Sequence, residues 1–349
     1  MTSSNPPSTA SVADAAGRVV EYVRVSVTDR CDMRCVYCMP AEGMDFVGRK
    51  ELLTYEEIER IVRALAPFGV RSVRITGGEP LIRRDIVELI RRVAAVPGVD
   101  DVAMTTNARL LRKNAAELKA AGLRRVNVSL DSLDPVRFSE LTRGEHLEAV
   151  LDGIEAAREV GILPIKINAV VVRGENELEV ADIVRWSRER DIIPRFIEIM
   201  PMGEIGWFNE SKLVASAALR ERMQREGLEL EPIDAGSDAD APGSGPARYW
   251  RARDRGVAGS PWSRVGFISP ITENFCDACN RIRITPTGSI RACLGWDDSN
   301  SLRDIMRNGC SDAELLDVIQ ASLRLKRAGH EFEADGSGNT ATSMSSIGG

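Results

Sequence analysis

Apolar strands alternate with amphipathic helices along about the first 200 residues, and this alternation limits which folds the chain can adopt. Six segments have the pattern of strands: Val20–Thr28, Ser72–Thr76, Asp101–Asn107, Arg125–Asp131, Pro164–Val172 and Pro194–Met200. Five helix-period segments lie between them, near residues 54–68, 82–96, 110–121, 146–160 and 177–190. Strands that are separated by helices pair in parallel through right-handed crossovers. The sequence therefore predicts an α/β fold built as a partial (β/α)6-type TIM barrel.

One face of these strands is polar, although the inside of a closed barrel is normally filled with Val, Ile and Leu. In the first strand Arg24, Ser26 and Thr28 share a face, and three valines share the other. The same alternation puts further polar residues on that face: Arg74, Thr76, Thr105, Asn107, Asn127, Ser129, Asp131, Lys166 and Asn168. Because helices cover the outside of a parallel sheet, the polar face must line the inside. Burying it without partners would be costly, so the pattern predicts a solvated cavity that holds a ligand.

The composition is typical of an ordinary folded protein and narrows the ligands that it can bind. The 349 residues are 43% hydrophobic and 28% charged, which is enough for two domains with a large core. The net charge of −6, from 46 Lys and Arg against 52 Asp and Glu, argues against unspecific nucleic-acid binding. An anionic ligand must therefore meet a local basic cluster. With only two histidines, His146 and His330, chemistry built on several imidazoles is excluded.

Nothing in the sequence predicts secretion or insertion into a membrane. No apolar run approaches the ~18 residues that cross a bilayer. The N-terminal residues are rich in Ser, Pro and Ala but lack the basic start and apolar stretch of a secretory signal. We therefore expect a cytoplasmic protein that has neither a membrane nor nucleic acid as a partner.

Shifts in composition divide the chain into five stretches. Residues 1–17 are expected to be a disordered leader, 18–233 the barrel, 234–247 a flexible loop, 248–333 a smaller C-terminal domain, and 334–349 a mobile tail. The loop is rich in Gly, Ala, Asp, Ser and Pro, and the tail in Gly, Ser and Thr.

Three cysteines follow the first strand directly. Cys31, Cys35 and Cys38 have the spacing C-x3-C-x2-C, and three thiolates can ligate three irons of a four-iron cluster and leave the fourth iron open. A structural zinc ion usually takes four ligands, so a zinc site completed from elsewhere is the alternative. The end of a barrel strand is also where such folds place their active sites.

A second cysteine triad lies near the C-terminus. Cys276, Cys279 and Cys293 are spaced C-x2-C-x13-C, again without an obvious fourth ligand. A zinc ribbon would need a second CxxC pair, which the sequence lacks, so a second cluster with an open iron is preferred. Cys310 stands alone and is interpreted as a buried apolar side chain.

The first triad resembles the motif of the radical S-adenosylmethionine (SAM) superfamily. The segment Gly77–Pro80, GGEP, looks like the superfamily's strand-end motif for the amino group of SAM. Both triads together narrow the resemblance to the GTP 3′,8-cyclase family of molybdenum cofactor biosynthesis. It covers roughly residues 18–333 and the extreme C-terminus, in the strings VRVSVTDRCDMRCVYCMP, RITGGEPLIRRD, RRVNVSLDSLD, PRFIEIMPMG and NFCDACNRIRIT. The family usually has Gly where Ala108 stands, which puts the need for a positive φ there in doubt.

The resemblance implies a radical SAM lyase that holds two 4Fe-4S clusters, the first binding SAM and the second binding GTP. The implied product is (8S)-3′,8-cyclo-7,8-dihydroguanosine 5′-triphosphate. An external one-electron donor would reduce the enzyme, and a cyclic pyranopterin monophosphate synthase would consume the product. The implied SAM contacts are Tyr37, Gly78, Ser129 and Met200. The implied GTP contacts are Arg24, Arg74, Thr105, Lys166, Arg195, Arg281 and Arg283, and the terminal Gly348 and Gly349 are implied to reach the active site.

Two alternatives remain open at this point. Another radical SAM enzyme with an auxiliary cluster, such as a peptide-modifying one, would share the first triad, although such enzymes commonly carry more cysteines in the C-terminal domain. A zinc-stabilised nucleic-acid-binding protein is the second, and the acidic balance and the missing fourth ligands speak against it. Both a monomer and a homodimer are compatible with the sequence.

Overall fold

The computed structural model describes residues 13–203, 210–233, 245–296, 300–338, 340 and 342–348, whose strands form one continuous sheet. The strands are β1 (Tyr22–Ser26), β2 (Ser72–Thr76), β3 (Asp101–Thr106), β4 (Arg125–Ser129), β5 (Ile165–Val171), β6 (Ile193–Glu198), β7 (Leu228–Pro232), β8 (Arg248–Asp254), β9 (Ser263–Ile268), β10 (Arg281–Ile284), β11 (Ser289–Arg291) and β12 (Asn300–Ser301). Their order across the sheet is β12-β11-β10-β1-β2-β3-β4-β5-β6-β9-β8-β7.

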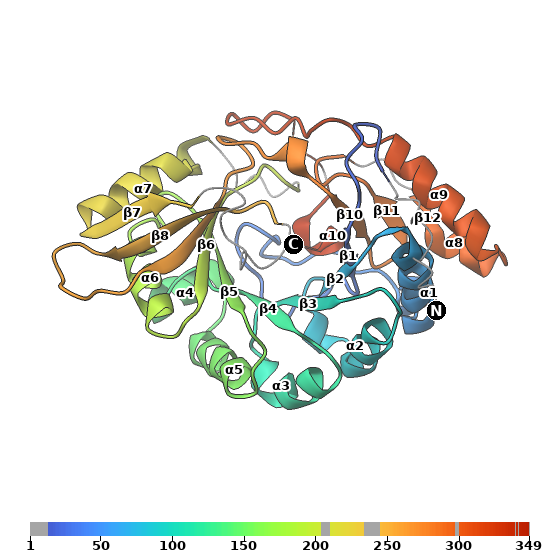
Figure 1. The fold of residues 1–349 in the computed structure, drawn as a ribbon, viewed down its shortest axis with the longest axis horizontal. Coiled ribbons are helices and arrows are strands. Elements are labelled where there is room, and N and C mark those ends of the chain that lie inside the picture. Colours follow the sequence, from blue (N-terminus) through green and yellow to red (C-terminus); the bar gives the residue numbers. More distant parts are fainter. Residues whose placement is uncertain are drawn as a thin grey trace, which may run out of the picture.

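The helices alternate with the strands in the first two thirds of the chain. The α-helices are α1 (Tyr55–Leu65), α2 (Ile86–Ala94), α3 (Leu111–Ala120), α4 (Pro135–Thr142), α5 (Leu147–Glu159), α6 (Val180–Arg188), α7 (Ser216–Arg225), α8 (Leu302–Arg307), α9 (Asp312–Arg324) and α10 (Met344–Ile347). The short 3₁₀ helices are η1 (Arg49–Glu51), η2 (Ala66–Phe68), η3 (Pro80–Ile82), η4 (Glu210–Lys212) and η5 (Cys276–Ala278). The expected partial barrel with parallel strands is confirmed, and Figure 1 shows its helices on the outside of the curved sheet.

The sheet extends beyond the six predicted strands at both edges. β10 pairs in parallel with β1, and β9 pairs in parallel with β6. Each then leads into antiparallel strands, β11 and β12 on one side and β8 and β7 on the other. The C-terminal residues therefore continue the barrel wall on both sides. Because β7 and β12 end the order, the barrel is open rather than closed.

The alternation of side chains along the strands explains why the two faces of the sheet differ. Val23 and Val25 of β1 and Val27 after it are at most 1% exposed, and they belong to the core between the sheet and the outer helices. Helix α1 begins where Thr54 and Glu57 form a capping box, with Glu57 N donating to Thr54 Oγ1 at 3.2 Å. The opposite side chains of the strands are left to line the inside of the barrel.

The first described residues do not form a disordered leader. Ala13 pairs with Val19 in an isolated bridge, and Asp14 is 6% exposed. Asp14 is held by ion pairs with Arg18 and Lys326, which explains why the segment is ordered although its composition is polar. Residues 1–12 lie outside the described part of the chain.

The end of the chain is also docked, which corrects the expectation of a mobile tail. Helix α10 lies inside the curve of the barrel, where Figure 1 places the C-terminus. Ile347 is 1% exposed and packs with Met202 and Phe332, so burial of apolar surface holds the segment. Gly349 lies outside the described residues, and so do residues 234–244 of the expected flexible loop.

Two further details bear on the sequence-based expectations. Ala108 has a φ of 61°, so the left-handed conformation is present although the residue is not glycine. Within the described residues, no helix is long and apolar enough to cross a membrane.

Replacing Gly153 by Ala should destabilise the protein, although Gly-to-Ala changes inside helices normally stabilise. A Cβ at Gly153 would lie 2.2 Å from the carbonyl oxygen of Ala108, which is far inside van der Waals contact. We expect a loss of about 1–3 kcal/mol in the free energy of unfolding, measured by chemical denaturation. Glu148→Ala, at an exposed position of the same helix, is the control and should change stability by less than about 0.5 kcal/mol. A Gly153→Ala variant as stable as the wild type would show that α5 and the loop at Ala108 are less closely packed.

Candidate functional site

A cavity of about 280 Å³ runs along the inside of the barrel, and all six cysteines of the two triads line it. The first triad follows the carboxyl end of β1, whereas Cys276 and Cys279 precede the amino end of β10. Because β1 and β10 are parallel neighbours, the two triads lie at opposite ends of this strand pair, which is about 13 Å long at ~3.3 Å per residue. The cavity therefore connects two cysteine loops through the interior of the sheet.

Most of the predicted site residues line this cavity. They are Arg24, Thr105, Arg195, Arg281 and Arg283 of the set implied to contact GTP, and Tyr37, Gly78, Ser129 and Met200 of the set implied to contact SAM. Arg74 of β2 and Lys166 of β5 do not belong to this lining, and both are buried. Cys310 lies away from the cavity, where its carbonyl oxygen and sulfur face Arg60.

The GGEP segment lies directly against the loop that carries the first triad. Gly78 N donates to Thr28 O at 2.7 Å, and Glu79 N donates to Arg30 O at 2.8 Å. A Cβ at Gly78 would lie 2.2 Å from the Arg30 carbonyl oxygen, so only glycine permits this approach. The ends of β1 and β2 are thereby fixed side by side at the first triad.

Glu79 is the centre of a hydrogen-bond network that supports this loop. It is fully buried and accepts hydrogen bonds from Thr106 Oγ1 at 2.8 Å, Asn107 N at 2.6 Å and Leu81 N at 2.9 Å. Burial raises its pKa to about 7 although the hydrogen bonds oppose the shift. Asn107 in turn donates to Asp32 at 2.7 Å, so the network reaches the residue that follows Cys31.

The thiols of the first triad are poor acids in the metal-free protein. Burial raises the pKa of Cys31 to about 12 and that of Cys38 to about 11, and it holds the pKa of Cys35 well above its ordinary value. Glu79, Asp32 and Asp131 add to these shifts because they are acidic neighbours. A thiolate-binding metal would therefore displace protons here when it binds.

The second triad has a more positive environment. Burial alone would raise the pKa of Cys279, but Arg281 and Lys326 outweigh it and lower the pKa to about 7. Burial raises the pKa of Cys293, against which Arg283 acts. This loop therefore favours the thiolate form more than the first one does.

The arrangement of the sulfurs is informative about the kind of metal group. In the part of the chain that the structure describes, no three His, Cys, Asp or Glu side chains are placed to hold a single metal ion. A zinc ion needs its ligands within about 2.3 Å of one point, whereas cysteines that bind an iron–sulfur cluster surround a larger body. The three cysteines of each triad line one cavity, so each triad has room for a group larger than a single ion.

Tyr37 is fixed by a residue that the sequence analysis had assigned only to a polar face. Its hydroxyl donates to Asp131 Oδ2 at 2.5 Å, and Val170 N donates to the other carboxylate oxygen at 2.8 Å. Asp131 is 3% exposed, and burial raises its pKa to about 6. The Tyr37 ring is thereby held at the cavity wall beside Cys35 and Cys38.

The basic side chains are brought together by strand register. Arg24 lies opposite Arg283 of β10 and Arg74 of β2. Lys166 of β5 and Arg195 of β6 complete the set on the far side of the barrel. Four of these cations are almost fully buried: Arg74 at 5%, Lys166 at 2%, Arg195 at 5% and Arg283 at 7% exposed.

Several of these buried donors point to an anion. Arg74 Nε, Arg195 Nε and Arg283 Nη1 have no hydrogen-bond partner among the described residues. Desolvation and the neighbouring cations lower the pKa of Arg74 to about 9 and that of Lys166 to about 6. Buried donors of this kind normally have partners, so the site is built for a ligand with several negative charges.

Two interior residues were missed by the sequence analysis, Tyr22 and Arg125. Tyr22 is 3% exposed and lies between Arg24 and Arg74, whose guanidinium carbons are 5.8 and 5.4 Å from its ring centroid. Arg125 forms an ion pair with Asp101, joining Nε to Oδ1 at 2.8 Å. The alternation of side chains along β4 could have predicted that Arg125 points into the barrel, because Arg125 lies on the same face as Asn127 and Ser129.

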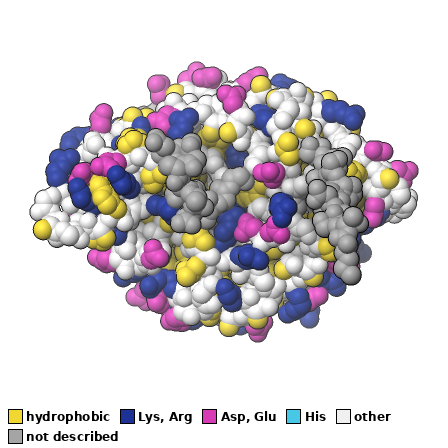
Figure 2. All heavy atoms as spheres, in the orientation of Figure 1, with side chains coloured by type: hydrophobic (Ala, Val, Ile, Leu, Met, Phe, Trp, Pro, Cys, Tyr) yellow, Lys and Arg dark blue, Asp and Glu magenta, His cyan; other side chains and the backbone are white. Residues whose placement is uncertain are grey.

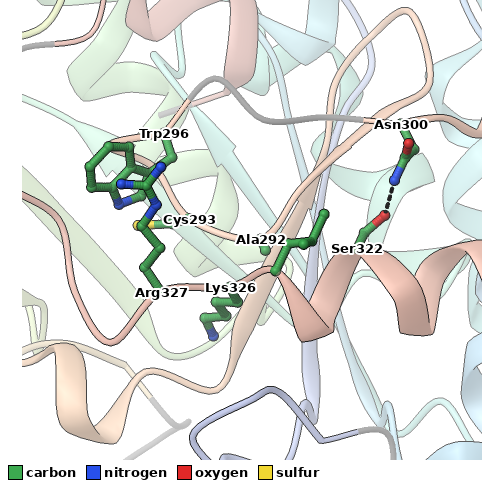
Figure 3. A pocket seen from close by; sticks show the side chains of 8 residues that line it. Ala292, Cys293, Trp296, Asn300, Ser322, Lys326 and Arg327 are labelled. Carbon is green, nitrogen blue, oxygen red and sulfur yellow. Dashed lines mark hydrogen bonds between the residues drawn. The ribbon is translucent and has the colours of Figure 1, made fainter.

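The outer surface has a different charge pattern from the interior. On the face shown in Figure 2, Lys and Arg side chains are interspersed with Asp and Glu. A small pocket of about 20 Å³ lies outside the second triad and shares Cys293 with the main cavity. There the Arg327 guanidinium lies over the Trp296 ring, 3.4 Å from its centroid (Figure 3).

The end of the chain reaches the inner wall of the barrel. Gly348 has a φ of +78°, and a Cβ there would lie 2.4 Å from Thr76 Cγ2 and 3.1 Å from Ser26 Cβ. Met344 and Ser345 line the cavity. The tail therefore approaches the ends of β1 and β2 closely, as only a residue without a side chain can.

Comparison with known sequences identifies relatives over nearly the full length. A model of the Radical SAM superfamily matches residues 25–187, and one named Molybdenum Cofactor Synthesis C matches residues 192–332. The GTP 3′,8-cyclase of Listeria monocytogenes serovar 1/2a is 42% identical over 96% of this chain and 98% of its own length. The GTP 3′,8-cyclase of Rhodopseudomonas palustris (strain CGA009) is 43% identical over 95% of this chain and 93% of its own length.

Comparison with solved structures supports the fold alone. Streptococcus suis SuiB bound to S-adenosylmethionine has a TM-score of 0.56 at 19% identity, over 81% of this chain and 63% of the SuiB chain. SuiB bound to the precursor peptide SuiA has a TM-score of 0.59 at 19% identity, over 83% and 65%. This chain thus spans under two thirds of the SuiB length, and the likeness carries no statement about substrate.

Replacing Lys166 by Met should change how stability depends on pH. Desolvation lowers the pKa of Lys166 to about 6 in the folded protein, whereas its ordinary value is 10.5. Between these two pH values the unfolded chain therefore binds one proton more than the folded protein. Lys166 should therefore make the ligand-free protein more stable as pH rises, by about 1.4 kcal/mol per unit, and Lys166→Met should lose that slope. Chemical denaturation of both proteins at about pH 6.5 and about pH 8.5 measures the difference. Equal slopes for the two proteins would contradict the desolvated lysine.

Proposed function

Because the chain belongs to the GTP 3′,8-cyclase family within the radical SAM superfamily, we propose that it cyclises GTP to 3′,8-cyclo-7,8-dihydroguanosine 5′-triphosphate. This reaction serves molybdenum cofactor biosynthesis. The proposal rests mainly on one observation. Two cysteine triads and several arginines line the same interior cavity, and two further basic side chains are buried in the barrel. That arrangement suits a nucleoside triphosphate held between two metal groups.

Cys31, Cys35 and Cys38 would hold the first 4Fe-4S cluster, with its fourth iron open to SAM. Bound there, a reduced cluster supplies the electron that cleaves SAM and so starts radical chemistry. Gly78 keeps the strand end free of side chain where the amino group of SAM would bind, and Tyr37 offers an aromatic surface fixed by Asp131. Ser129 and Met200 are proposed to complete the SAM site from the ends of β4 and β6.

Cys276, Cys279 and Cys293 would hold a second cluster, whose open iron would bind the guanine. The spacing C-x2-C-x13-C contains no fourth cysteine, which supports an open position. The positive surroundings of Cys279 favour the thiolate form that such a group requires.

The triphosphate is proposed to lie between these sites. Arg24, Arg195 and Arg283 face the cavity and offer forked donors that suit phosphate oxygens. Arg281 would act at the cavity wall near Cys279, and Thr105 offers a hydroxyl from β3. Arg74 and Lys166 are buried in the barrel and do not line the cavity, so they would attract the phosphates through their positive charge without contacting them.

The protein's own part in the reaction is to place and enclose the reactants. Burial in the barrel keeps water and other hydrogen donors away from a carbon radical. The docked tail narrows the cavity, since Met344 and Ser345 line it and Gly348 reaches its wall. An external one-electron donor would reduce the enzyme, and a separate synthase would convert the product to cyclic pyranopterin monophosphate.

The test is anaerobic reconstitution with iron and sulfide, followed by reaction with SAM, dithionite and GTP. The wild type should bind about eight irons and form 5′-deoxyadenosine only when GTP is present. Cys276→Ser should retain about four irons and still bind SAM, but it should form less than about one hundredth of the cyclised nucleotide, because GTP loses its metal anchor. Mass spectrometry of the product and iron analysis give both readouts.

Cys310→Ser is the matched control, because Cys310 lies outside the cavity and should be dispensable for iron binding and turnover. SAM cleavage driven by a peptide but not by GTP would refute the substrate assignment. Bound zinc without iron or sulfide would refute the cluster assignment.

A further inference from the structure

Three segments that are far apart in the sequence meet beside the second triad. They are residues 13–18, the loop from Cys276 to Cys279, and residues 326–329, which follow α9. Their contacts are made by charged side chains that are almost fully buried. The proposed function uses only the charge of Lys326, which lies near Cys279, and gives no role to Asp14 or Arg18.

The carboxylate of Asp14 lies at the centre of this contact, and its side chain is 0% exposed. Its Oδ1 accepts hydrogen bonds from Ala16 N and Arg18 N, each at 3.0 Å. Its Oδ2 accepts from Arg18 Nε at 2.7 Å and lies 3.2 Å from Lys326 Nζ. Burial alone would raise the pKa of Asp14, but these hydrogen bonds outweigh it and hold the pKa below its ordinary value.

The two cations extend from Asp14 to the backbone of the cysteine loop. Arg18 Nη1 donates to Cys276 O at 2.6 Å, and Lys326 Nζ donates to Cys279 O at 2.8 Å. Cys279 N also donates to Cys276 O at 3.0 Å, so Arg18 binds at the turn that sets the distance between the two cysteines. One buried carboxylate thus fixes two cations, and each cation holds one cysteine's carbonyl oxygen.

The residues after α9 close over the same loop. Arg18 also donates to Arg327 O at 2.9 Å and to Ala328 O at 2.8 Å. A Cβ at Gly329 would lie 3.3 Å from Cys276 Sγ, so this backbone packs tightly on the sulfur. In Figure 3 the side chains of Lys326 and Arg327 point in different directions, and only Arg327 lies against Trp296.

We propose that Asp14, acting through Arg18 and Lys326, is a positioning residue that holds the loop of Cys276 and Cys279 in the conformation that binds the second cluster. This inference rests on the proposed function, because it assumes that the loop binds a cluster. If the contact only anchored the N-terminal segment, its loss would lower overall stability without acting selectively on one of the two metal sites. The two roles are therefore separable by experiment.

The test uses the full chain in two backgrounds that each keep one triad. Substituting Cys31, Cys35 and Cys38 by Ser leaves the second triad alone, and the converse substitution of Cys276, Cys279 and Cys293 leaves the first. Each background is reconstituted with and without Asp14→Asn, and iron release to a chelator is followed by absorbance. Asp14→Asn should speed release from the second triad about tenfold, because two charge-assisted hydrogen-bond donors lose their anchor, and leave release from the first triad unchanged.

Spectroscopy and matched variants keep the test decisive. Asp14→Asn should also alter the electron paramagnetic resonance signal of the reduced second cluster and not that of the first. Lys326→Met should act like Asp14→Asn, and Lys326→Arg, which keeps a charged donor, should restore slow release. Asp254→Asn is the control for loss of a carboxylate that bridges two cations, Arg185 and Arg188, and it should leave both sites unchanged.

Two negative outcomes have different meanings. If the second-triad background binds iron but Asp14→Asn releases it no faster, or releases it equally faster from both triads, the positioning role is overturned and the proposed function stands. If the second-triad background binds no iron while the wild type binds only about four, the proposed function itself fails.

Discussion

Positive charge buried inside a parallel barrel is the constraint on which the rest of this structure depends. Arg74, Arg195 and Arg283 are each at most 7% exposed, and taking such groups out of water costs several kcal/mol unless they are paired. The chain meets part of this cost internally, through the ion pair of Arg125 with Asp101. Among the described residues, Arg74 Nε, Arg195 Nε and Arg283 Nη1 have no hydrogen-bond partner, so a ligand with several negative charges would complete their hydrogen bonding. A barrel filled with aliphatic side chains would be more stable, but it would have no site.

The position of the cysteines follows from the same sheet. The first triad begins beyond the carboxyl end of β1, whereas Cys276 and Cys279 of the second precede the amino end of β10, and these strands are parallel neighbours. The cations of β1, β2 and β10 thus lie between the triads rather than beside them. Close backbone packing supports each loop: Gly78 lies against Arg30 O at the first, and Gly329 against Cys276 at the second. The chain's two ends add to this, since Asp14 fixes the second loop and Gly348 reaches the ends of β1 and β2.

Local patterns in the sequence predicted the central strands and which of their faces is apolar. They could not predict contacts between segments that are far apart in the chain. Strand β2 matches its predicted bounds, and the period of two correctly assigned the valines of β1 to the outer core. The sequence analysis did not predict β9 and β10 as strands of the barrel. No helix-period segment precedes either of them, so neither has the βαβ pattern on which the prediction relied. Asp14 was assigned to a disordered leader because its partner Lys326 is more than 300 residues away. Ala108 adopts a positive φ although its side chain disfavours that conformation. Its local sequence therefore did not predict this conformation.

The central claim is that the buried cations form a binding site for the triphosphate, and calorimetry tests it most directly. Binding of GTP and of guanosine to the reconstituted protein should be compared near pH 7.5 in two buffers that differ in ionisation enthalpy. GTP should bind at least about a hundredfold more tightly than guanosine and take up close to one proton, because the phosphates restore the charge of Lys166. Equal affinities without proton uptake would contradict the account.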